Sequence, residues 1–273
     1  MNVESAAKEI RKEIIKMVWK GRAAHLGSAL SLVEILYVLY FKTANYSKEN
    51  MDSPDRDKII LSKGHGSAAL YSVLHKKGII SDEEIDNYSV NGGKLPCHID
   101  MYSAKGLEAS SGSLGHGIGI AEGMALADKM DGRNTQVYAV IGDGEANEGS
   151  VWEAVEFAAA RKLDNFTVIV DFNGIQSNGF GKDIIDQSNL SERFKAFGFE
   201  AYDIDGHDCE ALEKTLKLPH DRPKAIIAHT VKGKGVSFME NTVKSHYVRL
   251  DDALYEKAMS DIENNYGIAE AAK

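Results

Sequence analysis

Short apolar runs alternate with helix-like segments along most of this chain, and this alternation constrains its fold more than any other feature. Apolar runs typical of buried strands lie at 57–62, 135–143, 165–174, 199–205 and 224–231. Apolar residues at helical spacing lie at 4–20, 31–41, 150–163, 209–218 and roughly 251–264. Strands that alternate with helices in this way form parallel sheets with helices on both faces. We therefore predict one doubly wound α/β domain over residues 1–273, with a mostly parallel sheet.

Three further segments extend this pattern. A glycine turn after the first strand leads into a helix that ends at Gly78. Ser81 and Glu84 have the spacing of a capping box, which predicts the start of another helix. Small residues open the segment 111–130, which continues as a glycine-containing helix suited to close packing.

The charge and the cysteines of the chain argue against several classes of protein. A formal net charge of -9, with no basic tract, argues against nucleic acid as the main partner. Residues 1–21 are charged and amphipathic, unlike a signal peptide or a membrane span. Cys97 and Cys209 are far apart and form no CxxC motif, which suits a reducing cytosol. We predict a cytoplasmic protein that acts without nucleic acid or membrane partners.

The segment VIGDGEANEG at 140–149 combines glycines with three carboxylates. Glycine lets backbone N–H groups approach an anion closely, whereas Asp143, Glu145 and Glu148 should repel a bare phosphate. Asp143 ends one predicted strand and Asn173 ends the next, so both should lie at the carboxyl edge of the sheet. Two protein oxygens plus phosphate oxygens are the usual ligands of magnesium. The sequence therefore predicts a metal, bound by Asp143 and Asn173, that in turn holds an anion.

Two nucleotide-binding fingerprints are not satisfied. GHGIGIAEG at 115–123 lacks the spacing of a dinucleotide-binding loop, and no strand closely precedes it. GIQSNGF at 174–180 has the first two glycines of a P-loop but carries Phe180 where lysine is required. We therefore predict neither a Rossmann nor a Walker A site.

The histidines divide into two groups by their setting. We interpret His75, His207 and His220 as surface or hydrogen-bonded structural residues. A second group lies in loops at the ligand-binding edge rather than on helix faces, and consists of His25, His65, His98 and His246.

Several of these stretches together resemble a known enzyme family. GDG at 142–144, with Asn173 followed by Gly-Ile, is similar to the thiamine-diphosphate motif of thiamine-dependent enzymes. The contexts of the four loop histidines, with 111–127 and HTVKGKG at 229–235, resemble the N-terminal, diphosphate-binding region of transketolase. The resemblance covers nearly the whole chain in the right order, and it implies a thiamine-diphosphate-binding fold.

The resemblance also implies a set of site residues. Asp143, Asn173 and the backbone carbonyl of Ile175 would bind Mg²⁺, or alternatively Ca²⁺ or Mn²⁺. The residues implied for the cofactor are Ser28, His65, Gly112, Leu114, Asp143, Gly144, Asn173, Ile175, Lys232 and His246. The implied active-site residues, which hydrogen-bond sugar hydroxyls and transfer protons, are His25, His65, His98 and His246.

Three positions need separate comment. Glu148 matches an acidic position that couples two active sites across the family's interface, although an exposed acid at a helix start explains it nearly as well. His116 stands where many full-length transketolases have glutamine, and histidine is an acceptable polar substitute. SHYVRLDD at 245–252 replaces the usual His-Gly-Lys continuation, which leaves the role of His246 and the substrate open. Arg249 would be one source of the missing positive charge near a sugar phosphate.

The implied reaction is the reversible transfer of a two-carbon glycolaldehyde unit from a ketose, expected to be phosphorylated, to an aldose. In the family, the activating glutamate lies on a pyrimidine-binding domain, and a C-terminal domain follows it. Residues 1–273 match the diphosphate-binding domain alone. We therefore expect the N-terminal subunit of a split transketolase, active as an α2β2 assembly with a subunit that carries the other two domains. Met1 before a complete first helix, and the helical tail at 255–265, favour a natural subunit over an excised fragment.

Two other interpretations stay open from sequence. One is a different thiamine enzyme, similar to deoxyxylulose-phosphate synthase or to the α subunit of a 2-oxo acid dehydrogenase. The histidines argue against the dehydrogenase, and the short chain argues against the synthase. The other is a non-catalytic paralogue that binds the cofactor, which the intact Asp143, Asn173 and histidines disfavour.

Overall fold

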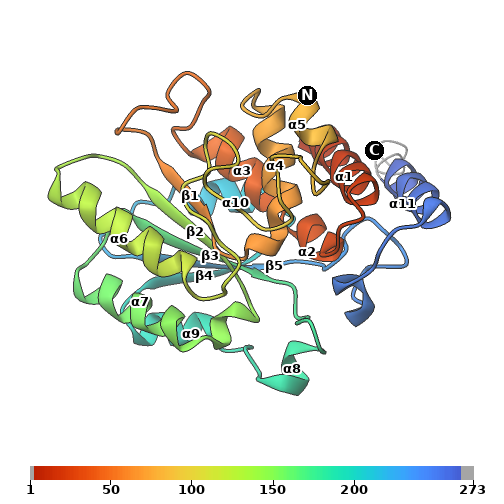
Figure 1. The fold of residues 1–273 in the computed structure, drawn as a ribbon. Helices are drawn as coiled ribbons and strands as arrows, with labels where there is room; N and C mark the ends of the chain where they lie inside the picture. The colour runs from red at the N-terminus through yellow and green to blue at the C-terminus, as the bar shows by residue number, and fades with distance from the viewer. Residues whose placement is uncertain (1–2, 266–273) are drawn as a thin grey trace.

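A five-stranded sheet lies at the centre of the computed structural model, which describes residues 3–265 (Figure 1). In spatial order its strands are β1 (Lys58–Leu61), β2 (Val137–Gly142), β3 (Phe166–Phe172), β5 (Lys224–His229) and β4 (Glu200–Asp205). Each strand lies inside one of the apolar runs predicted from sequence, and all pairings between these strands are parallel. The α/β prediction is therefore confirmed, with a sheet that is wholly rather than mostly parallel.

Successive residues of each strand point into two separate apolar cores. In β2, Tyr138 and Val140 belong to one core, whereas Ala139 and Ile141 belong to the other. This is the period of two that a pleated strand imposes. Because both faces are covered, β2 is buried throughout, and the same burial makes such strands visible in the sequence as continuous apolar runs.

Helices cover both faces of the sheet (Figure 1). The first core is completed by residues of α1 (Val3–Lys20), α2 (Leu26–Ser31), α3 (Val33–Val38), α4 (Ser67–Lys76), α10 (Cys209–Leu216) and α11 (Asp252–Asn265). The second core is completed by residues of α6 (Gly117–Met130), α7 (Gly149–Ala160) and α9 (Leu190–Ala196). The connecting segments contain two short helices, α5 (Asp82–Asp86) and α8 (Gly181–Ile184). Within residues 3–265 no helix combines the length and the apolar character needed to cross a membrane.

Two helix predictions had different outcomes. The capping box of Ser81 and Glu84 is present and starts α5, so that prediction is confirmed. The helix predicted at 31–41 is confirmed in part: α3 and a π-helical turn at Leu39–Thr43 cover most of it, but Ser31 ends a separate helix, α2, that was not predicted. Every residue of α2 and α3 is buried. Apolar residues at helical spacing locate a helix that is buried on one side. Because α2 and α3 are buried on all sides, such spacing does not show where each of them begins and ends.

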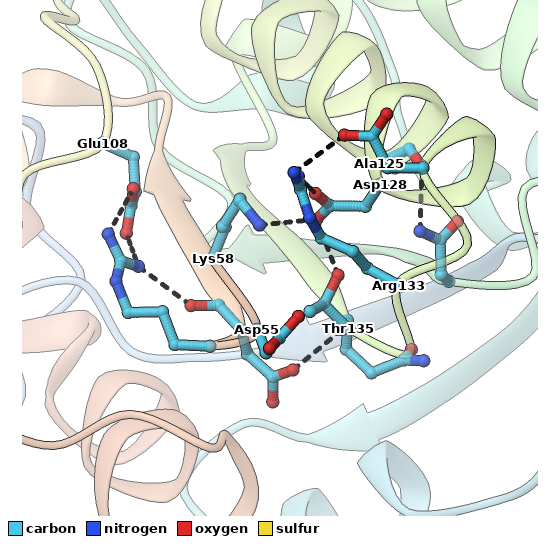
Figure 2. Close-up of polar contacts among 12 residues, drawn as sticks. Asp55, Lys58, Glu108, Ala125, Asp128, Arg133 and Thr135 are labelled. Atoms are coloured by element: carbon cyan, nitrogen blue, oxygen red, sulfur yellow. Dashed lines mark hydrogen bonds and ion pairs between the residues drawn. The ribbon is translucent and has the colours of Figure 1, made fainter. Parts of the chain in front are cut away.

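A polar network closes the amino end of the sheet (Figure 2). Asp128 near the end of α6 is buried and accepts hydrogen bonds from Lys58 Nζ at 2.5 Å and Thr135 Oγ1 at 2.6 Å. Its second oxygen accepts a hydrogen bond from Arg133 Nη1 at 2.9 Å. The network joins α6 to the first residue of β1 and to the loop before β2. Since the strands are parallel, it lies at the opposite edge of the sheet from their carboxyl ends.

Candidate functional site

A cavity of about 340 Å³ lies where β1, β2, β3 and β5 end. Residues that follow all four strands line it, as expected for a ligand site at the carboxyl edge of a parallel sheet. Its lining contains every residue that the sequence assigns to metal, cofactor or catalysis: His25, Ser28, His65, His98, Gly112, Leu114, Asp143, Gly144, Asn173, Ile175, Lys232 and His246. The fold therefore brings the whole predicted set to one place.

The predicted metal ligands lie on neighbouring strands. Residue 142 of β2 pairs with residue 171 of β3, so Asp143 and Asn173 follow adjacent strand ends. Asp143 is buried, and its two oxygens accept hydrogen bonds from the N–H groups of Gly144 at 2.9 Å and Gly174 at 2.7 Å. Gly174 has φ +72°, a conformation that glycine adopts without strain. The Asn-Gly pair after β3 thus lets the backbone turn toward Asp143.

The chemistry of these donors fits a hard cation. Burial, and after it the nearby charge of Asp171, raise the pKa of Asp143 and outweigh the opposing effects of Lys63 and of the two hydrogen bonds. A carboxylate, the side-chain oxygen of Asn173 and the carbonyl of Ile175 are all oxygen ligands of the kind that Mg²⁺ and Ca²⁺ prefer. Within residues 3–265 no group of three His, Cys, Asp or Glu side chains could hold a metal. A cation here would therefore depend on these mixed oxygens and on oxygens of its ligand.

Two buried lysines give the cavity positive charge. Lys232 Nζ donates to the Ile175 carbonyl at 2.7 Å and lies 3.1 Å from His246 Nδ1. Burial, followed by the charge of Lys63, lowers the pKa of Lys232 to about 8. Lys232 favours an anionic ligand, because such a ligand would offset its buried charge, whereas the charge of Lys63 is already paired with Asp171.

Lys63 was not predicted from sequence, and it belongs to a buried network behind the cavity. Its Nζ donates to Asp171 Oδ2 at 2.6 Å, and Ser31 Oγ donates to the same oxygen at 2.7 Å. The other oxygen of Asp171 accepts from Thr230. Although burial opposes ionisation, Lys63 and these hydrogen bonds hold the pKa of Asp171 below its ordinary value. The network fixes the ends of β1, β3 and β5 against α2, beside the predicted ligand Asn173.

The four loop histidines form a cluster around His25. The centroid of its ring lies 5.3 Å from His65, 5.5 Å from His98 and 4.9 Å from His246. Burial is the main cause that lowers the pKa of His25 to about 4 and that of His246 to about 3. Burial also holds the pKa of His65 well below its usual range. These three imidazoles are therefore neutral near pH 7, and neutral rings can both donate and accept hydrogen bonds.

Glu145 is the second buried carboxylate of the glycine-rich segment 140–149, after Asp143. It accepts hydrogen bonds from the N–H groups of Gly115 at 2.8 Å and Gly142 at 3.1 Å, and from the hydroxyl of Ser62. Burial raises its pKa. This side chain ties the loop before α6 to the ends of β1 and β2. Its role was not visible in the sequence, because two of its partners, Ser62 and Gly115, lie far from it along the chain.

The other residues singled out from sequence lie as follows. Glu148 is exposed and lines the cavity, whereas His116 is exposed and is absent from the lining. Arg249 is exposed and lines a different cavity, which Arg22 also lines. The histidines interpreted as structural are hydrogen-bonded: His75 to Glu13, His207 to Glu34 and His220 to the carbonyl of Arg222. That interpretation is confirmed.

Comparison with known proteins identifies the family of this chain. Residues 3–272 match the family model described as the thiamine diphosphate binding domain of transketolase. The chain belongs to the transketolase family. It is 36% identical, over 96% of its length and 97% of the relative, to the 6-deoxy-6-sulfo-D-fructose transketolase subunit SqwG of Clostridium sp. (strain MSTE9). It is 39% identical, over 90% of both chains, to an apulose-4-phosphate transketolase subunit of Actinobacillus succinogenes.

Solved transketolase structures share its fold. The Campylobacter jejuni transketolase superposes with a TM-score of 0.90 at 34% identity, over 96% of this chain but 43% of that one. Human transketolase is 34% identical over 95% of this chain and 42% of its own length. This transketolase-family chain therefore spans less than half the length of these full-length relatives.

Proposed function

We propose that this chain is the diphosphate-binding subunit of a thiamine-diphosphate- and Mg²⁺-dependent transketolase. The observation that carries the proposal is the convergence, in one cavity, of an oxygen set suited to a hard cation, two buried lysines and four histidines. The reaction would move a two-carbon glycolaldehyde unit from an anionic ketose to an aldose. Both relatives cited above are transketolase subunits whose names contain a sulfonated or phosphorylated sugar, which supports a ketose with a negatively charged end.

Each group of residues has a role in this proposal. Asp143, Asn173 and the Ile175 carbonyl would hold the metal, and Lys232 and Gly144 would contact the diphosphate. The remaining cofactor contacts would come from Ser28, His65, Gly112, Leu114 and His246. When bound, thiamine diphosphate supplies the electron-accepting centre that allows a carbon–carbon bond beside a carbonyl to break.

The protein's own chemistry in this proposal is hydrogen bonding and proton transfer. His25, His65, His98 and His246 would orient the sugar hydroxyls and carry protons to and from them. Their mutual contacts, at ring separations near 5 Å, support a shared ligand. Glu148, exposed at the cavity, would communicate with a second active site across a subunit interface.

We further propose that a second polypeptide completes the active site in an α2β2 assembly. This chain matches 43% of the Campylobacter transketolase, whereas it matches nearly all of two proteins named as transketolase subunits. The partner would carry the pyrimidine-binding domain, the C-terminal domain and the glutamate that activates the cofactor. The free cysteines Cys97 and Cys209 support a place for this enzyme in the cytoplasm.

Calorimetry with thiamine diphosphate tests the cofactor site. We expect the purified chain to bind it in the presence of Mg²⁺ and to lose affinity in EDTA. Asp143→Ala and Asn173→Ala should each weaken thiamine-diphosphate binding by about tenfold to a hundredfold, as is typical when groups at a metal site are removed. Asp221→Ala provides the matched control, because this exposed carboxylate precedes β5 at the amino edge. Unchanged affinity in both site variants would refute the assignment.

A further inference from the structure

We infer that Tyr247 forms the sugar-facing wall at the mouth of the cavity and selects among substrates by packing against their carbon chain. The inference rests on the proposed function and concerns Tyr247, a residue of the cavity lining to which the proposed function gives no role. Tyr247 directly follows His246 and carries a large ring.

The structure places that ring against the histidine cluster. Tyr247 lines the same cavity as the predicted site residues. Its ring centroid lies 4.6 Å from that of His246, nearly edge-on at 75°, and 5.7 Å from that of His25, tilted by 58°. The N–H of His25 also donates to the carbonyl of His246 at 3.1 Å, so the two segments run together beneath the tyrosine. Tyr247 is therefore positioned by both imidazoles.

Most of the tyrosine nevertheless remains uncovered. Tyr247 is 61% exposed, whereas His246 is 8% exposed and His25 is intermediate. Tyr247 thus lies where the cluster meets solvent, and a ligand that reaches His25 through this side of the cavity would contact its ring. Exposed aromatic residues are common on protein surfaces, but this one lines a cavity and contacts two of the proposed active-site histidines.

The chemistry of a sugar matches this arrangement. Its hydroxyl groups can pair with the imidazoles, while its C–H groups need an apolar surface, which an aromatic ring offers together with a polar hydroxyl. A tyrosine has only two side-chain torsions, so fixing it against a ligand costs little conformational entropy. The ring would therefore favour ketoses whose chain lies flat against it and disfavour those with a bulky group at the same place.

The test uses the chain assembled with its partner and loaded with cofactor. The probe is a pentitol 5-phosphate, a sugar analogue that has no carbonyl and cannot react. We expect Tyr247→Ala to weaken binding of this probe by about tenfold, and Tyr247→Phe to stay within about twofold, because the ring supplies most of the buried area. Tyr202→Ala, on β4 and outside the cavity lining, should leave the affinity unchanged.

Kinetics over a panel of ketoses of different chain length give a second readout. Tyr247→Ala should raise KM for the preferred ketose by about tenfold, change kcat by less than about threefold, and alter the order of preference among the ketoses. Calorimetry should show unchanged thiamine-diphosphate affinity in both Tyr247 variants.

Three results would overturn the inference. The first is unchanged probe affinity and unchanged sugar preference in Tyr247→Ala. The second is an equal loss of kcat on all sugars, which would assign the ring to cofactor orientation. The third is failure of Tyr247→Ala to assemble, seen by size-exclusion chromatography, which would assign the ring to the contact between subunits. Absence of cofactor binding in the unmodified chain, in contrast, would overturn the proposed function itself.

Discussion

At the scale of single residues, His25 combines a strained backbone with an unpartnered ring atom. Its φ of 66° lies in the left-handed region, which costs a non-glycine residue about 1–3 kcal/mol. Its Nδ1 atom is buried and has no hydrogen-bond partner within the described residues. Both costs occur at the centre of the histidine cluster. Backbone strain and an orphaned polar atom together indicate a residue held in place for a ligand.

The buried state of His25 gives stability a defined pH dependence. Burial, with smaller contributions from His98 and Lys232, lowers its pKa from 6.5 to about 4. Between these values the unfolded chain binds a proton that the folded chain does not. The titration of His25 should therefore leave the free energy of unfolding unchanged above pH 6.5 and lower it as the pH drops from 6.5 toward 4. Urea titrations at several pH values should show that the free energy of unfolding falls less steeply in His25→Gln than in the unchanged protein. An identical fall would contradict the assignment of this pH dependence to His25.

Lys232 offers a second test at this scale. Lys232→Met keeps most of the side-chain volume but removes the charge and the hydrogen bond to the Ile175 carbonyl. We expect thiamine-diphosphate affinity to fall by about ten- to a hundredfold, because hydrogen bonds to charged groups contribute about 1.5–3 kcal/mol. Lys234→Met, two residues away and outside the cavity lining, is the matched control. Equal affinities for the two variants by calorimetry would argue against a diphosphate contact.

The candidate site was predictable where its residues lie in local motifs. Asp143 and Asn173 were named from glycine turns and strand ends, the other site residues were named from the family resemblance, and all of them line the cavity. Lys63, Asp171 and Glu145 were not predicted. Lys63 lies 108 residues from its partner Asp171, and Ser62 lies 83 residues from Glu145. Side chains that act through such distant partners leave no local pattern, although a charged residue inside a buried strand, as at Asp171, is a signal that could have been used.

At the scale of secondary-structure elements, predictability follows burial. Strands covered on both faces appear as continuous apolar runs, and one-sided helices such as α1 show apolar spacing, so both were located from sequence. In the segment 26–43, the prediction of one helix at 31–41 missed α2 and the break after it, because α2 and α3 are buried on all sides. Its division into separate helices depends on the packing around it rather than on its own pattern.

The amino-edge network yields a prediction for the connection of α6 to the sheet. Although burial opposes ionisation, hydrogen bonds from Lys58, Thr135 and Arg133 hold the pKa of Asp128 below its ordinary value. Asp128→Ala removes the acceptor of Lys58 and Thr135, although Arg133 keeps its ion pair with Asp131, and should lower the free energy of unfolding by about 1–3 kcal/mol. The contribution of ionised Asp128 to the free energy of unfolding should be present above the pKa that Asp128 has in the unfolded chain. It should be lost as the pH falls through the pKa of Asp128 in the folded chain.

Chemical denaturation of matched variants measures this effect. Asp131→Ala is the control. Asp131 is an exposed carboxylate, and among the ion pairs of the described residues it takes part only in the one with Arg133. We expect its effect to stay below about 0.5 kcal/mol. Thiamine-diphosphate affinity should be unchanged in both variants, since the network lies at the edge opposite the cavity. Similar stabilities for the two variants would show that the network around Asp128 does not anchor α6.

At the scale of the whole molecule, the central expectation is that this chain does not act alone. The purified chain should catalyse no glycolaldehyde transfer, and adding the partner subunit should restore it. An assay with phosphorylated and sulfonated ketoses, together with the mass of the complex in solution, measures both points. Turnover by the isolated chain would contradict the two-subunit proposal. An active complex that contains the two subunits in a 2:1 ratio would contradict α2β2.

The separation of the two sheet edges has a consequence for how such a chain can change over evolutionary time. The Asp128 network joins α6 to one edge of the sheet (Figure 2), and the cavity lies at the other edge. Substitutions that adjust thermal tolerance can accumulate at the amino edge without altering the ligand. If Tyr247 contacts the sugar as inferred, substitutions in the loop after His246 would shift sugar preference while the sheet beneath stays intact. Adaptation to a new nutrient and adaptation to a new temperature would then draw on different residues.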